Sequence, residues 1–317
     1  MPLKDLKMLP KVRDSWSYVY VERCQVDQDA KAIAYRDVNG LTRIPVATLT
    51  LLMLGPGTTV THAAIRTLAE NGCSVLWVGE QAVRCYAQGI GETRSARRLL
   101  RQAQLWSDPQ AHLAVVREMY QMRFPEPLDT SLTLQQIRGK EGVRVRETYA
   151  RASREFGVAW SGREYRRSEW SFADPVNRAL SAANSCLYGV CHAAILSAGY
   201  SPALGFVHIG KQLSFVYDIA DLYKTEITIP AAFEAIAADE PGLESRVRRA
   251  CRDRFHQTRL LARVVDDIDH VLQSAQSTKT ATEEEDETLP SGLWDPELGV
   301  VPGGVDYSQP PEGETGG

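Results

Sequence analysis

The segment Gly205–Lys224 contains residue types whose spacing is suited to metal-dependent chemistry. It holds one histidine, His208, followed by a glycine-lysine turn, a short apolar run and two carboxylates, Asp218 and Asp221. If a helix begins at Asp218, the two carboxylates lie on one face of that helix. One imidazole and two carboxylates that converge on a point form a ligand set suited to Mg²⁺ or Mn²⁺.

A simpler interpretation of these three residues requires no metal. His208 would then be a surface side chain, Asp218 the N-cap of the helix and Asp221 an acid in its first turn, where the helix dipole stabilises negative charge. The three residues alone do not separate the two interpretations. The elements that position them must therefore be considered.

A long apolar helix is predicted directly before this segment. Asp174-Pro175 is a typical N-cap followed by proline at the first helical position, and Gly199 is a typical helix stop. The residues between them, Val176–Ser197, are apolar around most of the helix circumference, which indicates a buried central helix. Such a helix would support the neighbouring site rigidly.

The chain of 317 residues is long enough for two domains. Residues 1–88 alternate in strand fashion around an Asn39-Gly40 hairpin turn and are predicted to form a β-rich domain. Residues 89–92 are predicted to be a linker, and the hydrophobic period is helical over 93–275, with two helices expected in 230–275. Residues 276–317 form an acidic, low-complexity tail that is expected to be disordered.

The composition is typical of a soluble globular protein, with 44% hydrophobic and 24% charged residues. We see no apolar run of the length of a membrane span and no secretory signal at the N-terminus, so we expect a cytoplasmic protein that does not bind a membrane. The six cysteines form no C-x-x-C pair and are interpreted as core residues of a reducing compartment.

The net charge of −4 conceals an asymmetric distribution of charge. Residues 281–317 contain ten acids and no lysine or arginine, which leaves 36 basic and 30 acidic residues in the rest of the chain, a charge of +6. A basic body with an acidic tail suggests a protein that binds a polyanion, or a tail that docks elsewhere. The alternative is a tail that only increases solubility.

Several short motifs lie within residues 10–275 and together resemble one known family. They are Leu54-Gly55-Pro56-Gly57-Thr58, Trp77-Val78-Gly79-Glu80, Arg138-Gly139-Lys140-Glu141-Gly142, Ala182–Gly189, Gly205-Phe206-Val207-His208 and Phe215–Asp221. The chain resembles the CRISPR-associated integrase (spacer-acquisition endonuclease) family, in the branch that accompanies Cascade-type (type I-E) systems. The last two motifs are the most specific.

This resemblance implies an α+β fold, with a small N-terminal β-sandwich-like domain and a larger all-helical C-terminal domain that carries the metal site. The metal ligands of the family, a glutamate, a histidine and an aspartate, correspond here to Glu141, His208 and Asp221. The second aspartate of the family's catalytic set corresponds to Asp218, which we expect to orient the histidine or a metal-bound water. The expected cofactor is Mg²⁺ or Mn²⁺.

The resemblance also implies a reaction, a DNA transesterification. The free 3′-hydroxyl of a captured DNA fragment attacks a phosphodiester at the edge of a CRISPR repeat, so that a new spacer is inserted without ATP. Two alternatives remain open. One is a metal-dependent nuclease that uses water to hydrolyse branched or flapped DNA, and the other is a DNA-capture scaffold without catalysis.

Partners follow from the resemblance as well. They are DNA, a second copy of the chain in a homodimer, and a small partner subunit of the adaptation complex, with two dimers flanking one partner dimer. The tail segment Leu289–Val301 is a candidate for docking on that subunit. The residues expected to contact DNA are Arg84, Tyr165, Lys211, Lys224 and Arg248. One predicted helix face, with Arg94, Arg97, Arg98 and Arg101, is either a phosphate-binding track or a solvated surface.

Overall fold

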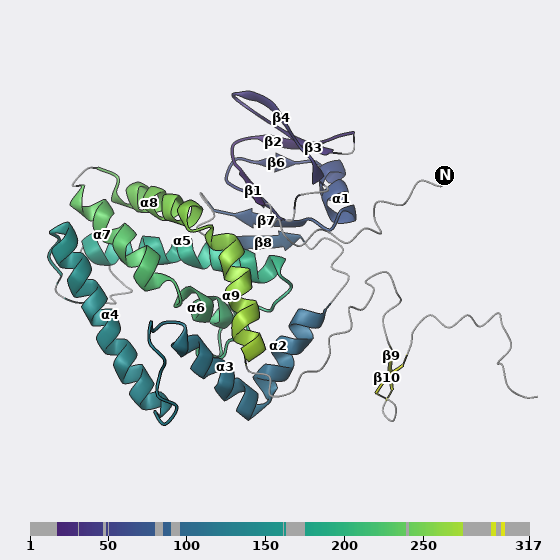
Figure 1. Cartoon of the computed structure of the whole chain (residues 1–317). Helices are drawn as coiled ribbons and strands as arrows, with labels where there is room; N and C mark the ends of the chain where they lie inside the picture. The colour runs from purple at the N-terminus through teal and green to yellow at the C-terminus, as the bar shows by residue number, and fades with distance from the viewer. Residues whose placement is uncertain are drawn as a thin grey trace, which may run out of the picture. The chain divides into compact units, whose positions relative to one another are not determined.

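Figure 1 shows a computed structural model of the chain. The structure describes residues 18–30, 32–46, 49, 51–79, 85–89, 96–160, 162, 175–238, 241–274, 293–295 and 299–301. Residues 10–277 form one compact unit, and residues 1–9 and 278–317 are grouped in another. The site described below belongs to the first unit.

Two four-stranded sheets form the N-terminal part of this unit. The first has the order β1 (Tyr18–Val21), β5 (Leu51–Leu54), β7 (Ser74–Val78) and β8 (Cys85–Gly89), and the second has the order β4 (Gly40–Ile44), β3 (Ala32–Asp37), β2 (Gln25–Asp29) and β6 (Thr59–Val60). In the first sheet β1, β5 and β7 are parallel and β8 is antiparallel. All of β5 is buried, as expected for a parallel strand covered on both faces.

One helix, α1 (His62–Glu70), packs against strands of both sheets. The hydroxyl of Thr61 caps it by accepting a hydrogen bond from the backbone N–H of Ala64. Ile33, Leu52 and Leu68 form part of the core between them. The β-rich N-terminal region is confirmed. Gly89, which we assigned to the linker, is instead the last residue of β8 and pairs with Val75.

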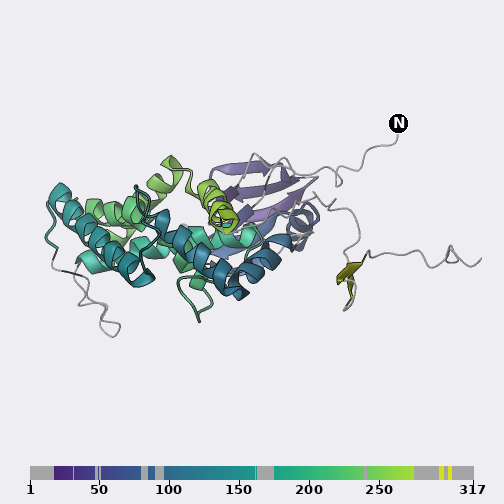
Figure 2. The same cartoon turned by 60° about the horizontal axis from the view of Figure 1, so that its bottom comes forward.

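The rest of the unit is helical (Figures 1 and 2). Its elements are α2 (Arg97–Ser107), α3 (Pro109–Gln121), α4 (Leu134–Phe156), α5 (Pro175–Ser197), α6 (Ser214–Ala220), the π-helical turn η5 (Lys224–Thr228), α7 (Ile229–Ala237), α8 (Leu243–Gln257) and α9 (Leu260–Ser274). The last region has three helices where we expected two. The chain turns at Gly242 and Arg259, both with positive φ, and each turn separates two helices.

The central helix is α5, as predicted. It packs against α6, α7, α8, α9 and η5. Its length and composition would also suit a membrane span, but 61% of its most apolar window is buried inside the fold, which is typical of a core helix. One continuous core joins Leu51 and Leu76 of the first sheet to Ile195 of α5 and Ile219 of α6. The site segment after α5 therefore rests on the main core.

The acidic tail contains one pair of strands among its described residues. β9 (Leu293–Asp295) and β10 (Gly299–Val301) are antiparallel, with Trp294 opposite Val300. These strands lie within the proposed docking segment Leu289–Val301. Its remaining residues lie outside the described part of the chain.

Candidate active site

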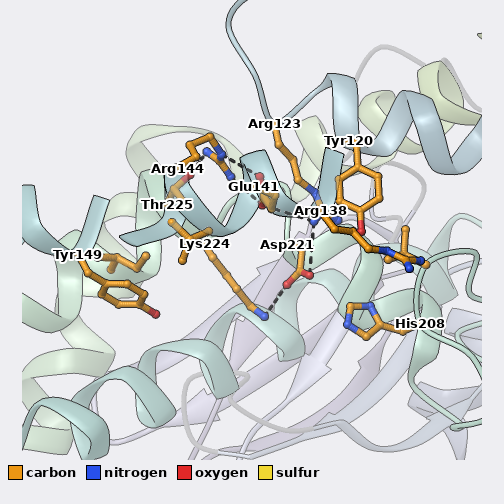
Figure 3. Close-up of a pocket in the computed structure, with 13 residues that line it drawn as sticks. Tyr120, Arg123, Arg138, Glu141, Arg144, Tyr149, His208, Asp221, Lys224 and Thr225 are labelled. Atoms are coloured by element: carbon orange, nitrogen blue, oxygen red, sulfur yellow. Dashed lines mark hydrogen bonds and ion pairs between the residues drawn. The ribbon is translucent and has the colours of Figure 1, made fainter. Parts of the chain in front are cut away.

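A cavity of about 320 Å³ is lined by residues of α4 and η5, by the end of α3 and by the segments before and after α6 (Figure 3). Three of the four predicted catalytic residues, Glu141, His208 and Asp221, line it. They come from α4, from the segment before α6 and from the C-cap of α6. The fold therefore brings together residues that are far apart in the sequence.

The fourth predicted residue, Asp218, lies beneath His208 and is fully buried. Its Oδ2 accepts hydrogen bonds from the backbone N–H groups of Phe206 (2.6 Å) and Val207 (3.0 Å). Its Oδ1 accepts the backbone N–H of His208 (2.8 Å) and lies 2.7 Å from Nδ1 of the same histidine. One carboxylate thus fixes both the backbone of this segment and the imidazole ring.

The contact with Asp218 also determines which nitrogen of His208 is available. An ionised carboxylate can only accept hydrogen bonds, so Nδ1 carries the proton. In the neutral imidazole the other nitrogen, Nε2, then carries the lone pair, and His208 is one of the residues that line the cavity. A carboxylate that holds a histidine in this way is a common arrangement behind metal ligands.

The interpretation of Asp218 as a helix N-cap is wrong. α6 begins at Ser214, so Asp218 lies within the helix and points inward, whereas Asp221 is its C-cap residue. The two carboxylates are three residues apart but have different surroundings, because Asp221 is 19% exposed at the cavity. Their spacing was evident from the sequence, but their different roles follow from the position at which the helix begins.

The segment before α6 is held by residues that our sequence reasoning did not identify. Gln102 donates to the carbonyl groups of Ser201 and Leu204, and Trp106 Nε1 donates to the carbonyl of Gly205 at 3.0 Å. A Cβ atom at Gly205 would lie 2.3 Å from a backbone oxygen, so only glycine fits this turn. A polar residue on an apolar helix face is the signal that could have indicated Gln102.

Both cavity carboxylates are paired with cations (Figure 3). Glu141 accepts hydrogen bonds from Arg144 Nε (2.9 Å) and Nη2 (3.0 Å), and Arg144 Nη1 also donates to Thr225 of η5. Asp221 lies 2.5 Å from the Lys224 Nζ. Burial lowers the pKa of Lys224, but the charge of Asp221, the Tyr188 side chain and the hydrogen bonds to both together outweigh it, so the pKa is raised.

Arg123, which directly follows the C-cap of α3, lies between the two carboxylates. Its Nη1 is 3.6 Å from Glu141 Oε1 and 3.7 Å from Asp221 Oδ2. Arg144, at i+3 from Glu141, was foreseeable from helical spacing. Arg123 was not, because it reaches the site from a different helix.

Among the described residues, no three His, Cys, Asp or Glu side chains lie close enough together to hold a metal ion. Cationic groups contact both carboxylates, so an ion would have to displace Arg123 and Lys224 from Asp221. The donor types fit nevertheless, because an oriented imidazole and two carboxylates line one cavity. The ligand set remains a prediction.

Of the predicted DNA contacts that the structure describes, only Lys224 lines the cavity. Lys211 is exposed in the turn before α6, and Arg248 lies on α8, where it donates to Ser245 Oγ at 2.9 Å. Arg84 and Tyr165 lie outside the described residues. Of the four arginines predicted to share one helix face, Arg94 lies outside the described residues, and two on α2 make contacts within the fold. Arg98 pairs with Asp269 at 2.7 Å, and Arg101 donates to the carbonyl of Leu272.

A family model described as CRISPR associated protein Cas1 matches residues 17–126 and 122–242 of this chain. The chain belongs to the Cas1 family. A curated Cas1 relative, CRISPR-associated endonuclease Cas1 2 from Thermus thermophilus, is 56% identical over 312 residues, which cover 98% of this chain and 96% of that protein. The Cas1 of Escherichia coli K12 is 45% identical, over 86% of this chain and 90% of that protein.

Solved Cas1 structures agree with this assignment. The crystal structure of a TtCas1–DNA complex matches with a TM-score of 0.76 and 58% identity, over 84% of this chain and 99% of that one. A Cas1 protein from Thermotoga maritima matches with a TM-score of 0.56 at 13% identity, and this likeness concerns the fold alone. The predicted combination of an N-terminal β region with a larger helical Cas1 domain is confirmed.

Proposed function

We propose that this chain is the metal-dependent DNA integrase of a CRISPR adaptation system. Its family includes proteins named CRISPR-associated endonucleases, which supports a nuclease or integrase in general. In the proposed reaction the 3′-hydroxyl of a captured fragment attacks a phosphodiester at the repeat edge. One P–O bond forms, one breaks, and the departing strand keeps a new 3′-hydroxyl.

The observation that carries this proposal is the charge pattern of the cavity. Its lining includes four cationic residues, Arg123, Arg138, Arg144 and Lys224, and two carboxylates, Glu141 and Asp221. An excess of positive charge favours a phosphate group. The carboxylates and the lone pair of His208 would at the same time supply ligands to a Mg²⁺ or Mn²⁺ ion.

Each residue then has a definable task. Glu141, His208 and Asp221 would hold the ion, which would act as a Lewis acid on the phosphodiester and lower the pKa of the attacking hydroxyl. Asp218 keeps the His208 ring oriented, with Nδ1 bound to the carboxylate, so that Nε2 is the nitrogen that would bind the ion. The cationic side chains of the cavity bind the phosphate oxygens and stabilise the charge that develops in the transition state.

The partners are also part of the proposal. The DNA complex of the similar TtCas1 supports DNA as a ligand. We further propose a homodimer, a small partner subunit flanked by two such dimers, and action in the cytoplasm. Arg84, Tyr165, Lys211 and Arg248 remain candidates for contacts to the DNA backbone or to an unpaired base. Truncation after Ser277 tests whether the tail docks on the partner subunit, since unchanged binding would exclude it.

The test is strand transfer of a duplex fragment into a supercoiled plasmid that carries the repeat, with and without the partner subunit. We expect product with Mg²⁺ or Mn²⁺ and none with a chelator. His208→Ala and Asp221→Ala should abolish the product while they retain folding and DNA capture, and the exposed Asp129→Ala should retain all three. Strand transfer by either site variant would refute the ligand assignment.

Hydrolysis by water is the second candidate, because the relatives are named endonucleases. The same cavity would serve, with water in place of the 3′-hydroxyl. A fragment that ends in a dideoxynucleotide separates the two reactions, because it stops strand transfer and leaves hydrolysis unaffected. Cleavage of branched or flapped DNA that continues with this fragment would establish the nuclease reaction.

A further inference from the structure

Arg123 is a buried charge whose hydrogen bonds are incomplete. Its side chain is 4% exposed, and the distances of 3.6 and 3.7 Å from Nη1 to Glu141 and Asp221 are too long for hydrogen bonds. Within the described part of the chain, Nε and Nη2 are buried without a hydrogen-bond partner. The guanidinium group lies over the ring of Tyr120, 4.9 Å from its centre (Figure 3).

A structural need for this arginine is not apparent from its surroundings. Glu141 already has Arg144 as a two-point partner, and Asp221 already has Lys224. Buried donors that lack acceptors reduce stability, so Arg123 is a poor stabilising residue. Its effect is instead to add positive charge at the place where two candidate metal ligands face each other.

The positive charge of Arg123 has opposite effects on the two species expected to bind in the cavity, a divalent cation and a phosphate group. A guanidinium group next to both carboxylates repels a divalent cation at short range and attracts a phosphate. A phosphodiester that enters the cavity brings the negative charge that offsets Arg123. The carboxylates of Glu141 and Asp221 would then be able to bind an ion in place of Arg123.

We propose that Arg123 makes metal binding at this site depend on bound DNA. Without DNA, the additional positive charge of Arg123 beside Glu141 and Asp221 weakens binding of the ion. With DNA, the phosphate offsets Arg123 and metal affinity rises. This inference rests on the proposed function, because it assumes that the cavity holds a metal. Linkage requires that the metal raise DNA affinity by the same factor.

The experiment measures Mn²⁺ affinity from the electron paramagnetic resonance signal of the free ion. The full chain is titrated with and without a saturating duplex that ends in dideoxynucleotides, so that no strand transfer occurs. For the wild type we expect DNA to tighten Mn²⁺ binding by about tenfold or more. For Arg123→Met, which keeps an unbranched side chain but removes the guanidinium group over Tyr120, we expect tight binding without DNA and an enhancement below about threefold.

Three further variants control the interpretation. Arg123→Lys keeps the charge and should behave like the wild type, and Arg151→Met removes an exposed charge on the same chain and should also do so. Arg123→Gln is titrated in parallel, so that the test remains decisive if the methionine variant does not fold. Circular dichroism and thermal unfolding establish that each titrated variant is folded.

Several outcomes would overturn the inference. The first is an unchanged enhancement by DNA in both charge-removing variants. The second is weaker Mn²⁺ binding by those variants without DNA, which would make Arg123 a residue that organises the ligands. The third is equal Mn²⁺ affinity of the wild type with and without DNA, which leaves the proposed function intact. A wild type that binds no Mn²⁺ under either condition would refute both proposals.

Discussion

The carboxylate of Asp218 offers a sharp test, because a single atom can be changed. In Asp218→Asn one oxygen becomes an NH₂ group of nearly the same size. Each oxygen of Asp218 faces two donors. They are the N–H groups of Phe206 and Val207 at Oδ2, and the N–H and Nδ1 of His208 at Oδ1. The new NH₂ group must therefore face two donors in either orientation.

One orientation of the asparagine is less costly than the other. At the Oδ2 position the NH₂ group would oppose two backbone N–H groups, neither of which can change. At the Oδ1 position it opposes one backbone N–H and the ring of His208, which can move its proton from Nδ1 to Nε2 and accept. We therefore expect the second orientation. It places a proton on Nε2, the nitrogen that would bind the metal.

The magnitude follows from these contacts. One buried N–H loses its acceptor, at a cost of about 1–3 kcal/mol, and the remaining bonds lose the assistance of a charged acceptor. We expect the free energy of unfolding to fall by about 2–4 kcal/mol. Mn²⁺ affinity in the presence of DNA should fall by about 10–100-fold, which is typical when the carboxylate behind a ligating histidine is lost. Strand transfer should decline in proportion.

Urea unfolding and Mn²⁺ titration of the purified variant measure the two effects separately. Asp129→Asn is the matched control, because Asp129 also accepts hydrogen bonds but is exposed, and it should change neither quantity appreciably. A stable Asp218→Asn protein with wild-type metal affinity would refute the tautomer argument. A variant that loses stability but keeps metal affinity would limit Asp218 to a structural role.

Three other predictions concern the support of the site. Burial lowers the pKa of His192 below its ordinary value of 6.5, so the unfolded chain binds the proton first, and the free energy of unfolding should fall as the pH drops below about 6.5. Urea titrations should show that His192→Gln reduces this dependence, and an identical slope would contradict the assignment. Tyr223→Phe removes the 2.6 Å hydrogen bond to the Asp267 carboxylate and should lower the free energy of unfolding by about 2 kcal/mol. An unchanged urea midpoint would contradict this expectation. Gly205→Ala places a Cβ atom 2.3 Å from a backbone oxygen and should lower both the melting temperature and Mn²⁺ affinity, whereas Gly139→Ala, in open space on a helix, should stabilise the chain by about 1 kcal/mol. Equal melting temperatures for these two variants would contradict the packing argument.

Residues near one another in the sequence were predicted well. The hairpin at Asn39-Gly40 and the apolar helix after Asp174 both depend on local signals, and each element is present. His208, Asp218 and Asp221 of the segment Gly205–Lys224 were predicted to lie together. In the structure Asp218 contacts His208, and His208 and Asp221 line one cavity. Only the position of the helix start was misjudged, because the apolar run before Asp218 is itself the first turn of α6.

Residues that meet only through the tertiary fold were not predictable in the same way. Glu141 entered through the resemblance to a family, since nothing in α4 alone indicates a partner in α6. Arg123 had no local signal, because its significance arises from helices that pack together, and Gln102 showed only a polar side chain on an apolar helix face. For the same reason Arg98 and Arg101, which match a phosphate-binding pattern by spacing, in fact hold α9.

The π-helical turn η5 shows how the remaining geometry depends on distant residues. It begins at Lys224, directly after the loop that follows Asp221, and a π turn is a common distortion at functional sites. Two side chains of α9 form hydrogen bonds to this turn and to the residue before it. Arg263 makes two hydrogen bonds to Glu226, and Asp267 accepts the hydroxyl of Tyr223. The ion pair between Lys224 and Asp221 is therefore set by a helix that contributes no residue to the cavity lining. Substitutions on α9 should consequently change metal affinity without any contact to the ligands.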